Sequence, residues 1–451
     1  MLTSRALAAI GTAAMAALLM LLAPAILADL DLRLYDSLPR PSVTATEPAR
    51  TLIVAIDERS LSELGRWPWP RRVTGDLVDR LRSMGASIVA LDVLLAEAEP
   101  GASTAPDGSA DVALAEALAR APAVTAYAFT FGGEGADLAC APRQFPLVQR
   151  TSPGSPEIQG LSQASGAVCS IALFDRAVGA SGFINAATDA DGRVRRTPVL
   201  VAYRQHVYPS LALAAVLRAG GETTIRLEPR SDGSPVLHVG QRQVPLDPRG
   251  QVLLRYRGPG GTIPRVSAAD VIADRVPADA VRGRVVLIGP TAIGLGDVVS
   301  TPVDSAFPGV EVHATVVEGL LSGRVNARPV FAQLIELGLA GLAGLAVVWA
   351  ARRLGHLWAA LAAGALGAGA WLAAGVLLGR TGLYLSPLFT MVAAVGAVGF
   401  ETGRSVLWER RRTHTAQRFV VHVLTSLTET KNVETGRHVR RTEAYARLLA
   451  T

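Results

Sequence analysis

The 451-residue chain has almost no lysine and little charge for its length. All but one of its 44 lysine and arginine residues are arginine, the exception being Lys431. A Gly-Lys-Ser/Thr phosphate loop is therefore excluded, and so is a lysine Schiff base before Lys431. Charged residues make up 18% of the chain, against about 25% in ordinary soluble domains. With a mean hydropathy of +0.32, this composition excludes a disordered chain, a collagen and a coiled-coil rod, and it predicts membrane segments.

The chain also lacks the short motifs of common enzyme classes. It contains no Cys-x-x-Cys, no His-Glu-x-x-His and no serine in the setting of a Ser-His-Asp triad. The large region before residue 331 is therefore predicted to be a binding module. Its two cysteines, Cys140 and Cys169, are the only ones in the chain. A disulfide and two buried free thiols both remain open, because the sequence does not fix the distance between them.

The net charge of +6 would suit a nucleic-acid partner, but the distribution of arginine argues against one. Arg5, Arg352, Arg353 and residues 410–412 all flank apolar runs. This is the positive-inside pattern of a membrane protein. We therefore expect a membrane, and no nucleic acid, as the partner of these arginines.

Four apolar runs are long enough to span a bilayer, which takes about 20 residues. They cover residues 6–28, 331–351, 357–379 and 381–400. For the first run we favour an uncleaved anchor over a signal peptide. Glu336 interrupts the second run, and we expect its side chain to reach the membrane interface. The arginine asymmetry places both termini in the cytoplasm of a multi-pass protein of the bacterial inner membrane, with residues 29–330 outside, in the periplasm or extracellular space.

The outer region alternates short apolar strands with helical stretches. This pattern predicts a parallel α/β sheet. Residues 193–203 and 225–256 have the pattern of hairpins, so we expect the sheet to be mixed. The predicted organisation is an N-terminal anchor (1–28), an extracytoplasmic domain (29–330), three transmembrane helices (331–400), a cytoplasmic linker helix (401–431) and the start of another domain (432–451). The fold class is thus an α/β domain plus an all-α membrane part of four transmembrane helices.

Two aspartates and an aromatic loop are the candidate ligand contacts. Asp57 and Asp92 each end a predicted strand, the place where α/β sheets bind ligands. Such aspartates also cap helices, and that alternative stays open. Trp67, Trp69 and Arg71 form an aromatic loop that enters a helix. This loop is either a recognition surface or a packed helix entry.

Many segments of the outer region, in the same order along the chain, resemble the class-two CHASE sensor domains of bacterial membrane receptors. The resemblance covers about residues 30–325 and implies signal sensing without supplying a ligand. The segments that carry it are residues 30–39, IVAIDERS (53–60), WPWPR (67–71), GA (85–86), LDVL (91–94), GFIN (182–185), DADGRVRR (189–196), VLIG (286–289) and GVEVHA (309–314).

The tail contains an apolar stripe and a carboxylate–imidazole pair. Val420, Val423, Leu424 and Leu427 share one helical face, which predicts a partner helix and a homodimer. Further on, residues 434–446 resemble the opening of HD-GYP domains, metal-dependent phosphohydrolases that act on cyclic di-GMP.

The resemblance of the tail implies that Glu434 and His438 would be metal ligands in a complete output domain, with iron or manganese as the metal. As an isolated pair four residues apart, they could equally be a solvated surface contact. The family's His-Asp and Gly-Tyr-Pro stretches are absent before Thr451. We therefore expect a truncated output domain, with neither a cofactor nor hydrolase activity in this chain.

The sequence as a whole predicts a transmembrane sensor. Its outer domain would respond to an unknown ligand and, in a complete protein, control a cyclic di-GMP phosphodiesterase. A different output, such as a nucleotide cyclase or a histidine kinase, remains an alternative. A non-catalytic membrane binding protein is another.

Overall fold

The computed structural model describes residues 24–39, 48–99, 109–132, 140, 142–149, 160–231, 234–296, 298–431, 441–442 and 444–446. The chain divides into two compact units. The sheet unit consists of Ala28–Ala332 together with Leu372–Ser386, and the helical unit of Met1–Leu27, Gln333–Trp371 and Pro387–Thr451. Residues 372–386 thus belong to the sheet unit although a long helical segment separates them from it in sequence.

A seven-stranded mixed sheet forms the centre of the sheet unit, as the sequence predicts. Its strands are buried on both faces, which explains their continuous apolar runs. In β1, for example, Leu52 and Val54 pack into the core on one face and Ile53 into the core on the other. The parallel strands, in spatial order, are β14 (Arg265–Ser267), β1 (Thr51–Ile56), β15 (Val285–Pro290), β2 (Ile88–Leu91), β3 (Ala123–Thr130) and β6 (Ala180–Phe183), and β5 (Gly166–Val168) runs antiparallel to β3.

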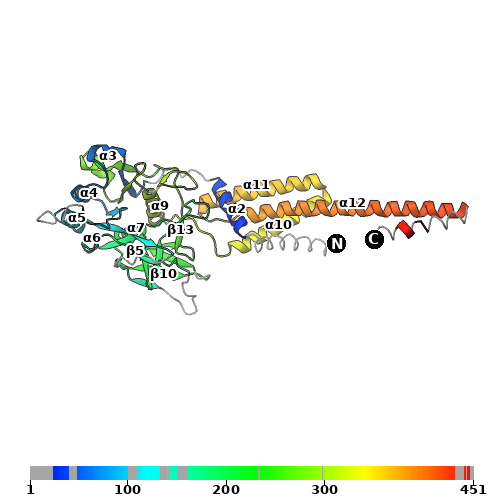
Figure 1. Cartoon of the computed structure of the whole chain (residues 1–451), viewed down its shortest axis with the longest axis horizontal. Helices are drawn as coiled ribbons and strands as arrows, with labels where there is room; N and C mark the ends of the chain where they lie inside the picture. Colours follow the sequence, from blue (N-terminus) through cyan, green and yellow to red (C-terminus); the bar gives the residue numbers. More distant parts are fainter. Residues whose placement is uncertain are drawn as a thin grey trace. The chain divides into compact units, whose positions relative to one another are not determined.

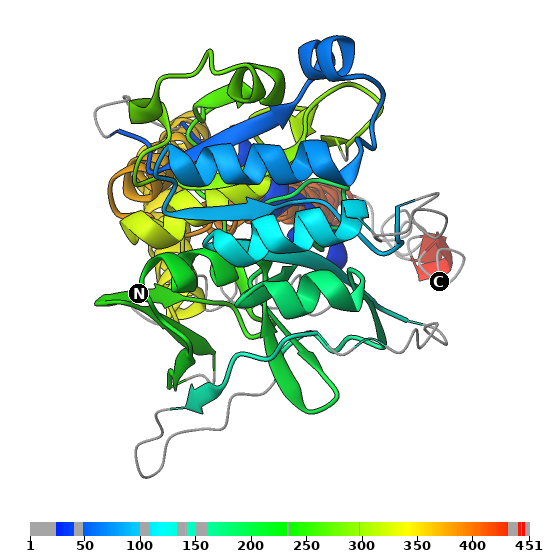
Figure 2. The same ribbon diagram turned by 90° about the vertical axis from the view of Figure 1, so that its left-hand side faces the viewer.

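Helices cover both faces of this sheet (Figures 1 and 2). One face carries α4 (Arg71–Ser83), α5 (Ser109–Arg120), α6 (Ala172–Ala177) and α8 (Ala268–Ile272). The short helix α3 (Glu58–Leu64) follows β1. The opposite face carries α7 (Leu211–Ala219) and α9 (Gly309–Ser322). The result is a three-layer α/β/α arrangement.

Smaller sheets lie beside this core. One is a four-stranded sheet of β12 (Arg242–Pro245), β11 (Pro235–Val239), β10 (Ile225–Pro229) and β4 (Leu147–Gln149). The others are strand pairs: β7 (Arg196–Pro198) with β13 (Gln251–Leu253), β8 (Leu200–Tyr203) with β9 (His206–Pro209), and β16 (Val298–Val299) with β17 (Phe307–Pro308).

The predicted hairpin at residues 193–203 is wrong. β8 pairs with β9 instead, because Arg204 and Gln205 have positive φ values of 46° and 65° and form the two-residue turn between them.

The membrane prediction is supported in part. Two helices, α10 (Ala332–Arg353) and α11 (His356–Thr381), are long and apolar enough to span a membrane among the residues described. Most of the first predicted run lies outside the described residues, and its end belongs to α2 (Pro24–Ser37). Four transmembrane helices are therefore not established.

The fourth predicted run does not form a separate helix from residue 381. Gly382, with φ +75°, ends α11, and Pro387 precedes α12 (Leu388–Lys431). This single helix continues through the predicted linker. In the helical unit, small side chains of α10, α11 and α12 pack together, among them Ala350, Ala359 and Ala394.

Two glutamates of the helical unit are buried. Glu401 of α12 bonds to the guanidinium of Arg352 at 2.7 Å and to that of Arg404 at 2.5 Å. Glu336, predicted to reach toward the interface, is instead fully buried. An ionised carboxylate needs partners when it is removed from water, and Glu401 has two arginines.

Candidate ligand-binding site

The carboxyl ends of the parallel strands surround a cavity of about 650 Å³. After β1 and β2 the chain crosses the face of the sheet that carries α4 and α5, whereas after β15 it continues to α9 on the other face. Such a change of face opens a crevice outside the carboxyl ends of the strands, where α/β sheets bind ligands. The cavity is lined by residues that follow β2 and β6, by the end of β15 and by the start of α9.

Most of the residues that line the cavity are apolar, and its polar atoms include one carboxylate–imidazole pair. Val93, Leu94 and Ile184 are among the apolar residues of this lining. The Nε2 atom of His313 lies 3.7 Å from the Oδ1 atom of Asp92, and both side chains are at most 10% exposed. Together the two groups can accept and donate hydrogen bonds, so the cavity suits a small molecule with an apolar part and a polar group.

Two residues fix the geometry around this pair. Asn185 binds the backbone of Phe129 in both directions, its Oδ1 accepting from N–H at 2.7 Å and its Nδ2 donating to the carbonyl at 2.8 Å. This pairing holds the end of β6 against β3. Gly289 in β15 allows α9 to approach, since a Cβ atom there would lie 2.7 Å from Val310 and 3.3 Å from Asp92.

The structure separates the predicted contact residues into two groups. Asp92 and Trp67 line the cavity. Asp57 instead caps α3, accepting from Ser60 N–H at 2.8 Å and from the hydroxyls of Ser60 and Ser267. Burial works against ionisation of Asp57, but these hydrogen bonds outweigh it and lower its pKa. Asp57 thus stabilises the N-terminus of α3, which is the helix-capping alternative considered for it.

Trp69 and Arg71 are held in internal contacts. Trp69 is 3% exposed, and its indole N–H donates to the carbonyl of Gly65. The Arg71 guanidinium binds Asp111 at 3.3 Å and the carbonyl of Glu97 at 2.9 Å. The aromatic loop is therefore a packed helix entry, with Trp67 alone of the three predicted residues reaching the cavity.

A buried arginine ties α2 to the sheet unit. Arg195 is 1% exposed and binds Asp36 through two hydrogen bonds of 2.8 and 2.6 Å. It also binds Asp189 and Asp191, the carboxylates of the DADG turn. The hydrogen bonds from Arg195 lower the pKa of Asp191 to about 2. Through Arg195, the carboxylates of this turn and Asp36 of α2 share one cation, which holds α2 against the sheet unit.

Three segments that lead to the long helices meet at one junction of the sheet unit. The Tyr35 hydroxyl of α2 accepts from Asn326 Nδ2 at 3.1 Å, and the Tyr35 ring packs edge-on against Tyr384 at 5.0 Å. The Tyr384 hydroxyl donates to Asp31 at 2.5 Å. Backbone hydrogen bonds between Ala327 and residues 382 and 384 close the junction.

Helix α9 connects the cavity to this junction. His313 lines the cavity within its first two turns, and Asn326 follows its last residue, Ser322, by four positions. Fourteen residues of α-helix span about 21 Å. Helix α9 and the four residues after it thus join the cavity wall to the junction within the sheet unit.

The remaining predicted sites have different outcomes. Cys140 and Cys169 are joined by a disulfide, with a Cα–Cα distance of 5.8 Å. Glu434 and His438 lie outside the described residues. Within the described ranges, no three His, Cys, Asp or Glu side chains are grouped closely enough to hold a metal ion.

His313, Asn185 and Arg195 were not among the predicted site residues. His313 and Asn185 each lie within a segment that carries the family resemblance, one at a helix start and one just after a strand. Their positions at the start of a helix and just after a strand were the only features of the sequence that could have pointed to them. The partners of Arg195 depend on contacts between distant segments, which no local pattern reveals.

The model of the CHASE2 domain family matches residues 12–351 of the chain. Neither a curated protein nor a solved structure matches it.

Proposed function

The chain belongs to the CHASE2 family, whose domains are extracellular sensors of signalling proteins, and from this premise we propose that it is a transmembrane receptor that binds a small molecule in the cavity at the carboxyl ends of its strands. The observation that carries the proposal is the path of α9. Its first turns line the cavity, and the chain beyond its end enters the junction with Tyr35 and Tyr384. A ligand that binds better to one position of α9 would shift the receptor toward that state.

The proposed ligand has an apolar body and at least one hydrogen-bonding group. Trp67 and the aliphatic wall suit the body, and Asp92 with His313 suits the polar group. A cavity of about 650 Å³ is the size of a small-molecule site.

The proposed topology is a multi-pass protein of the bacterial inner membrane, with the sheet unit outside and both termini in the cytoplasm. Helix α10 leaves the sheet unit, and the end of α11 returns to it through the backbone bonds of Ala327 with residues 382 and 384. Helix α12 would then cross once more. Its apolar part, residues 388–400, is about 20 Å long, so the pairing of Glu401 with Arg352 and Arg404 would neutralise charge near the inner surface.

A cavity-filling variant tests the receptor mechanism without a known ligand. Ala128→Phe places a ring in the cavity, and we expect it to change hydrogen exchange at residues 326–332 and 382–388 of the full chain in nanodiscs. In the Tyr35→Phe background, which lacks the hydroxyl that accepts from Asn326, this distant response should be reduced. Tyr203→Phe removes a hydroxyl from a ring that packs on Phe129 and Tyr208 instead of on the junction residues, and it is the matched control. An unchanged junction in Ala128→Phe would contradict transmission through α9.

The proposed output is an HD-GYP-like phosphohydrolase that acts on cyclic di-GMP, and only the resemblance of the tail supports it. In a chain carrying a whole output domain, Glu434 and His438 would contribute a carboxylate oxygen and an imidazole nitrogen to an iron or manganese centre, which would supply metal-dependent hydrolysis. In that longer chain, His438→Ala should weaken the affinity for the metal by well over tenfold, and the purified variant should therefore contain less metal. Metal content measured by mass spectrometry decides this, with His422→Ala as the control. Full metal content in the variant would contradict it.

A further inference from the structure

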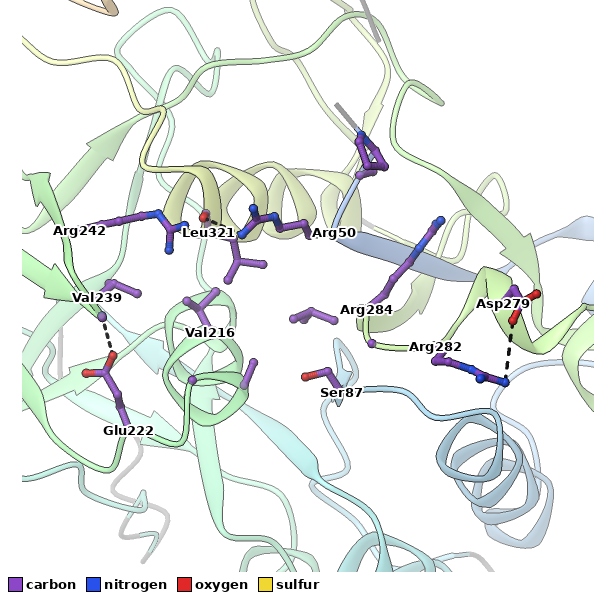
Figure 3. Close-up of a pocket in the computed structure, with 17 residues that line it drawn as sticks. Arg50, Ser87, Val216, Glu222, Val239, Arg242, Asp279, Arg282, Arg284 and Leu321 are labelled. Atoms are coloured by element: carbon purple, nitrogen blue, oxygen red, sulfur yellow. Dashed lines mark hydrogen bonds and ion pairs between the residues drawn. The ribbon is translucent and has the colours of Figure 1, made fainter. Parts of the chain in front are cut away.

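A second cavity, of about 630 Å³, lies at the opposite edge of the sheet, where β1, β15 and β2 begin. Arg50, Arg284 and Ser87 immediately precede these three strands, and Arg242 enters from the start of β12 (Figure 3). The side chains of Arg50 and Arg242 point toward one another beside Leu321 (Figure 3). Two strand starts and a separate sheet thus bring Arg50, Arg284 and Arg242 to one cavity, and a third strand start brings Ser87.

The positive charge of this cavity is only partly compensated. It contains four arginines and two carboxylates. Of the carboxylates, Glu222 binds Arg226 at 2.6 Å and Asp279 lies 3.8 Å from Arg282. Arg50, Arg242 and Arg284 have no carboxylate partner in the part of the chain that the structure describes, and Arg50 donates only to the carbonyl of Leu321, at 3.4 Å.

Helix ends do not offset the three arginines. The carboxyl-terminal ends of α7 and α9 face the cavity, represented by Gly220 and Leu321. Each helix end carries about half a negative charge. Two such ends amount to about one negative charge against three positive ones, so an excess of about two positive charges remains. That excess matches the charge of a phosphate monoester.

From these observations we propose that the cavity lined by Arg50, Arg242 and Arg284 binds a phosphate-bearing anion. Guanidinium groups bind phosphate oxygens with paired hydrogen bonds, and Ser87, which also lines the cavity, offers a hydroxyl as a further donor. The site is separate from the cavity at the carboxyl ends and lies at the other end of α9. An anion here would hold that end of α9, whose residue Leu321 lines the cavity.

The phosphate can come from a free molecule or from a lipid headgroup. A small neighbouring cavity shares Arg50 and extends to Arg255 and Arg324. The Arg255 guanidinium donates to the carbonyl of Gly379 at 2.5 Å, near the end of the apolar helix α11. The end of a membrane-spanning helix lies at the level of the lipid headgroups. Arg50 and Arg255 therefore extend from the cavity toward that level.

Anion-dependent stability of the full chain tests the site. The purified chain in a zwitterionic detergent is titrated with pyrophosphate at constant ionic strength, and the melting midpoint is followed by tryptophan fluorescence. Separate samples receive phosphatidylglycerol or phosphatidylcholine. The wild type should melt at higher temperature with pyrophosphate, with phosphatidylglycerol, or with both. A shift with pyrophosphate alone would identify the ligand as a free phosphate-bearing anion. A shift with phosphatidylglycerol alone would identify it as a lipid headgroup.

Matched variants locate the effect. R284Q should weaken the apparent affinity roughly tenfold or more, and R50Q/R242Q/R284Q should abolish the shift. The control R66Q/R72Q/R176Q removes the same charge from exposed positions outside the cavity and should bind like the wild type. S87D keeps every arginine but adds a carboxylate, and it should also abolish binding. A shift that persists in both the cavity triple variant and S87D, or no shift with either anion in the wild type, would overturn the proposal.

Discussion

At the scale of single residues, Arg195 has the most consequential surroundings in the sheet unit. It is 1% exposed and faces the carboxylates of Asp36, Asp189 and Asp191. A buried ion pair adds little net stability over an apolar replacement of the whole group, but removing one partner leaves charges without compensation. The sequence contains the motif DADGRVRR but does not show that its Arg195 binds Asp36, because Asp36 is about 160 residues away.

We expect Arg195→Met to lower the free energy of unfolding by about 3 kcal/mol, since three partly buried carboxylates lose their shared cation. Arg196→Met should cost less than about 1 kcal/mol, because Arg196 is 36% exposed and lies 3.8 Å from Asp189. Urea denaturation of both variants, followed by tryptophan fluorescence, measures the difference. Equal losses would show that the buried network is not specifically stabilising.

Asp175 should make stability depend on pH. Burial raises its pKa from about 3.8 to about 6, against the opposing charge of Arg143. The folded state therefore holds the proton more tightly than the unfolded state, and stability falls as pH rises from about 4 to 6. Asp175→Asn should raise the free energy of unfolding by about 1–2 kcal/mol at pH 7, after allowance for partial exposure. At pH 4 the same substitution should change it very little. A gain that is the same at both pH values would contradict this titration.

At the scale of elements, local patterns predict what local contacts determine. The apolar run of residues 51–56 coincides with β1, and the apolar residues at helical spacing in 310–321 lie within α9. The pairing of β7 with β13 could not be predicted, since it joins segments about fifty residues apart. Likewise, two aspartates after strands had the same sequence signal, yet Asp92 lines the cavity and Asp57 caps a helix, because only the tertiary structure sets their neighbours.

Helix α12 is the element through which we propose that two copies associate. Its forty-four residues extend for about 66 Å. Val420, Leu424 and Leu427 lie on one face and are each more than half exposed. A continuous apolar stripe on an exposed helix favours pairing with the same stripe of a second copy.

Leu424→Cys should therefore give a disulfide-linked dimer in membranes treated with a mild oxidant. The introduced thiol would be the only free one, since Cys140 and Cys169 are bonded to one another. Arg418→Cys lies on the opposite face and should cross-link much less. Non-reducing electrophoresis measures the dimer fraction, and equal fractions for the two variants would argue against a dimer through this stripe.

At the scale of the whole molecule, the proposed topology makes an all-or-none prediction. Alkaline phosphatase is active only outside the cytoplasm, because it needs disulfides to fold. A fusion after residue 200 should be active, and a fusion after residue 415 should be inactive. Enzyme assays on intact cells, with fusion levels checked by immunoblot, measure both. The reverse pattern would place the sheet unit in the cytoplasm.

The discontinuous make-up of the sheet unit determines which piece of such a receptor can be exchanged for another. A graft that ends at residue 330 would carry Tyr35 and Asn326 but leave behind Tyr384, which packs on Tyr35 and binds Asp31. A graft that extends to Pro387 keeps the junction intact, because Leu372–Ser386 belong to the same unit. Recombination between receptors, in the laboratory or in evolution, should therefore preserve sensing when the crossover falls after α11, so that the hairpin of α10 and α11 is inherited with its sensor.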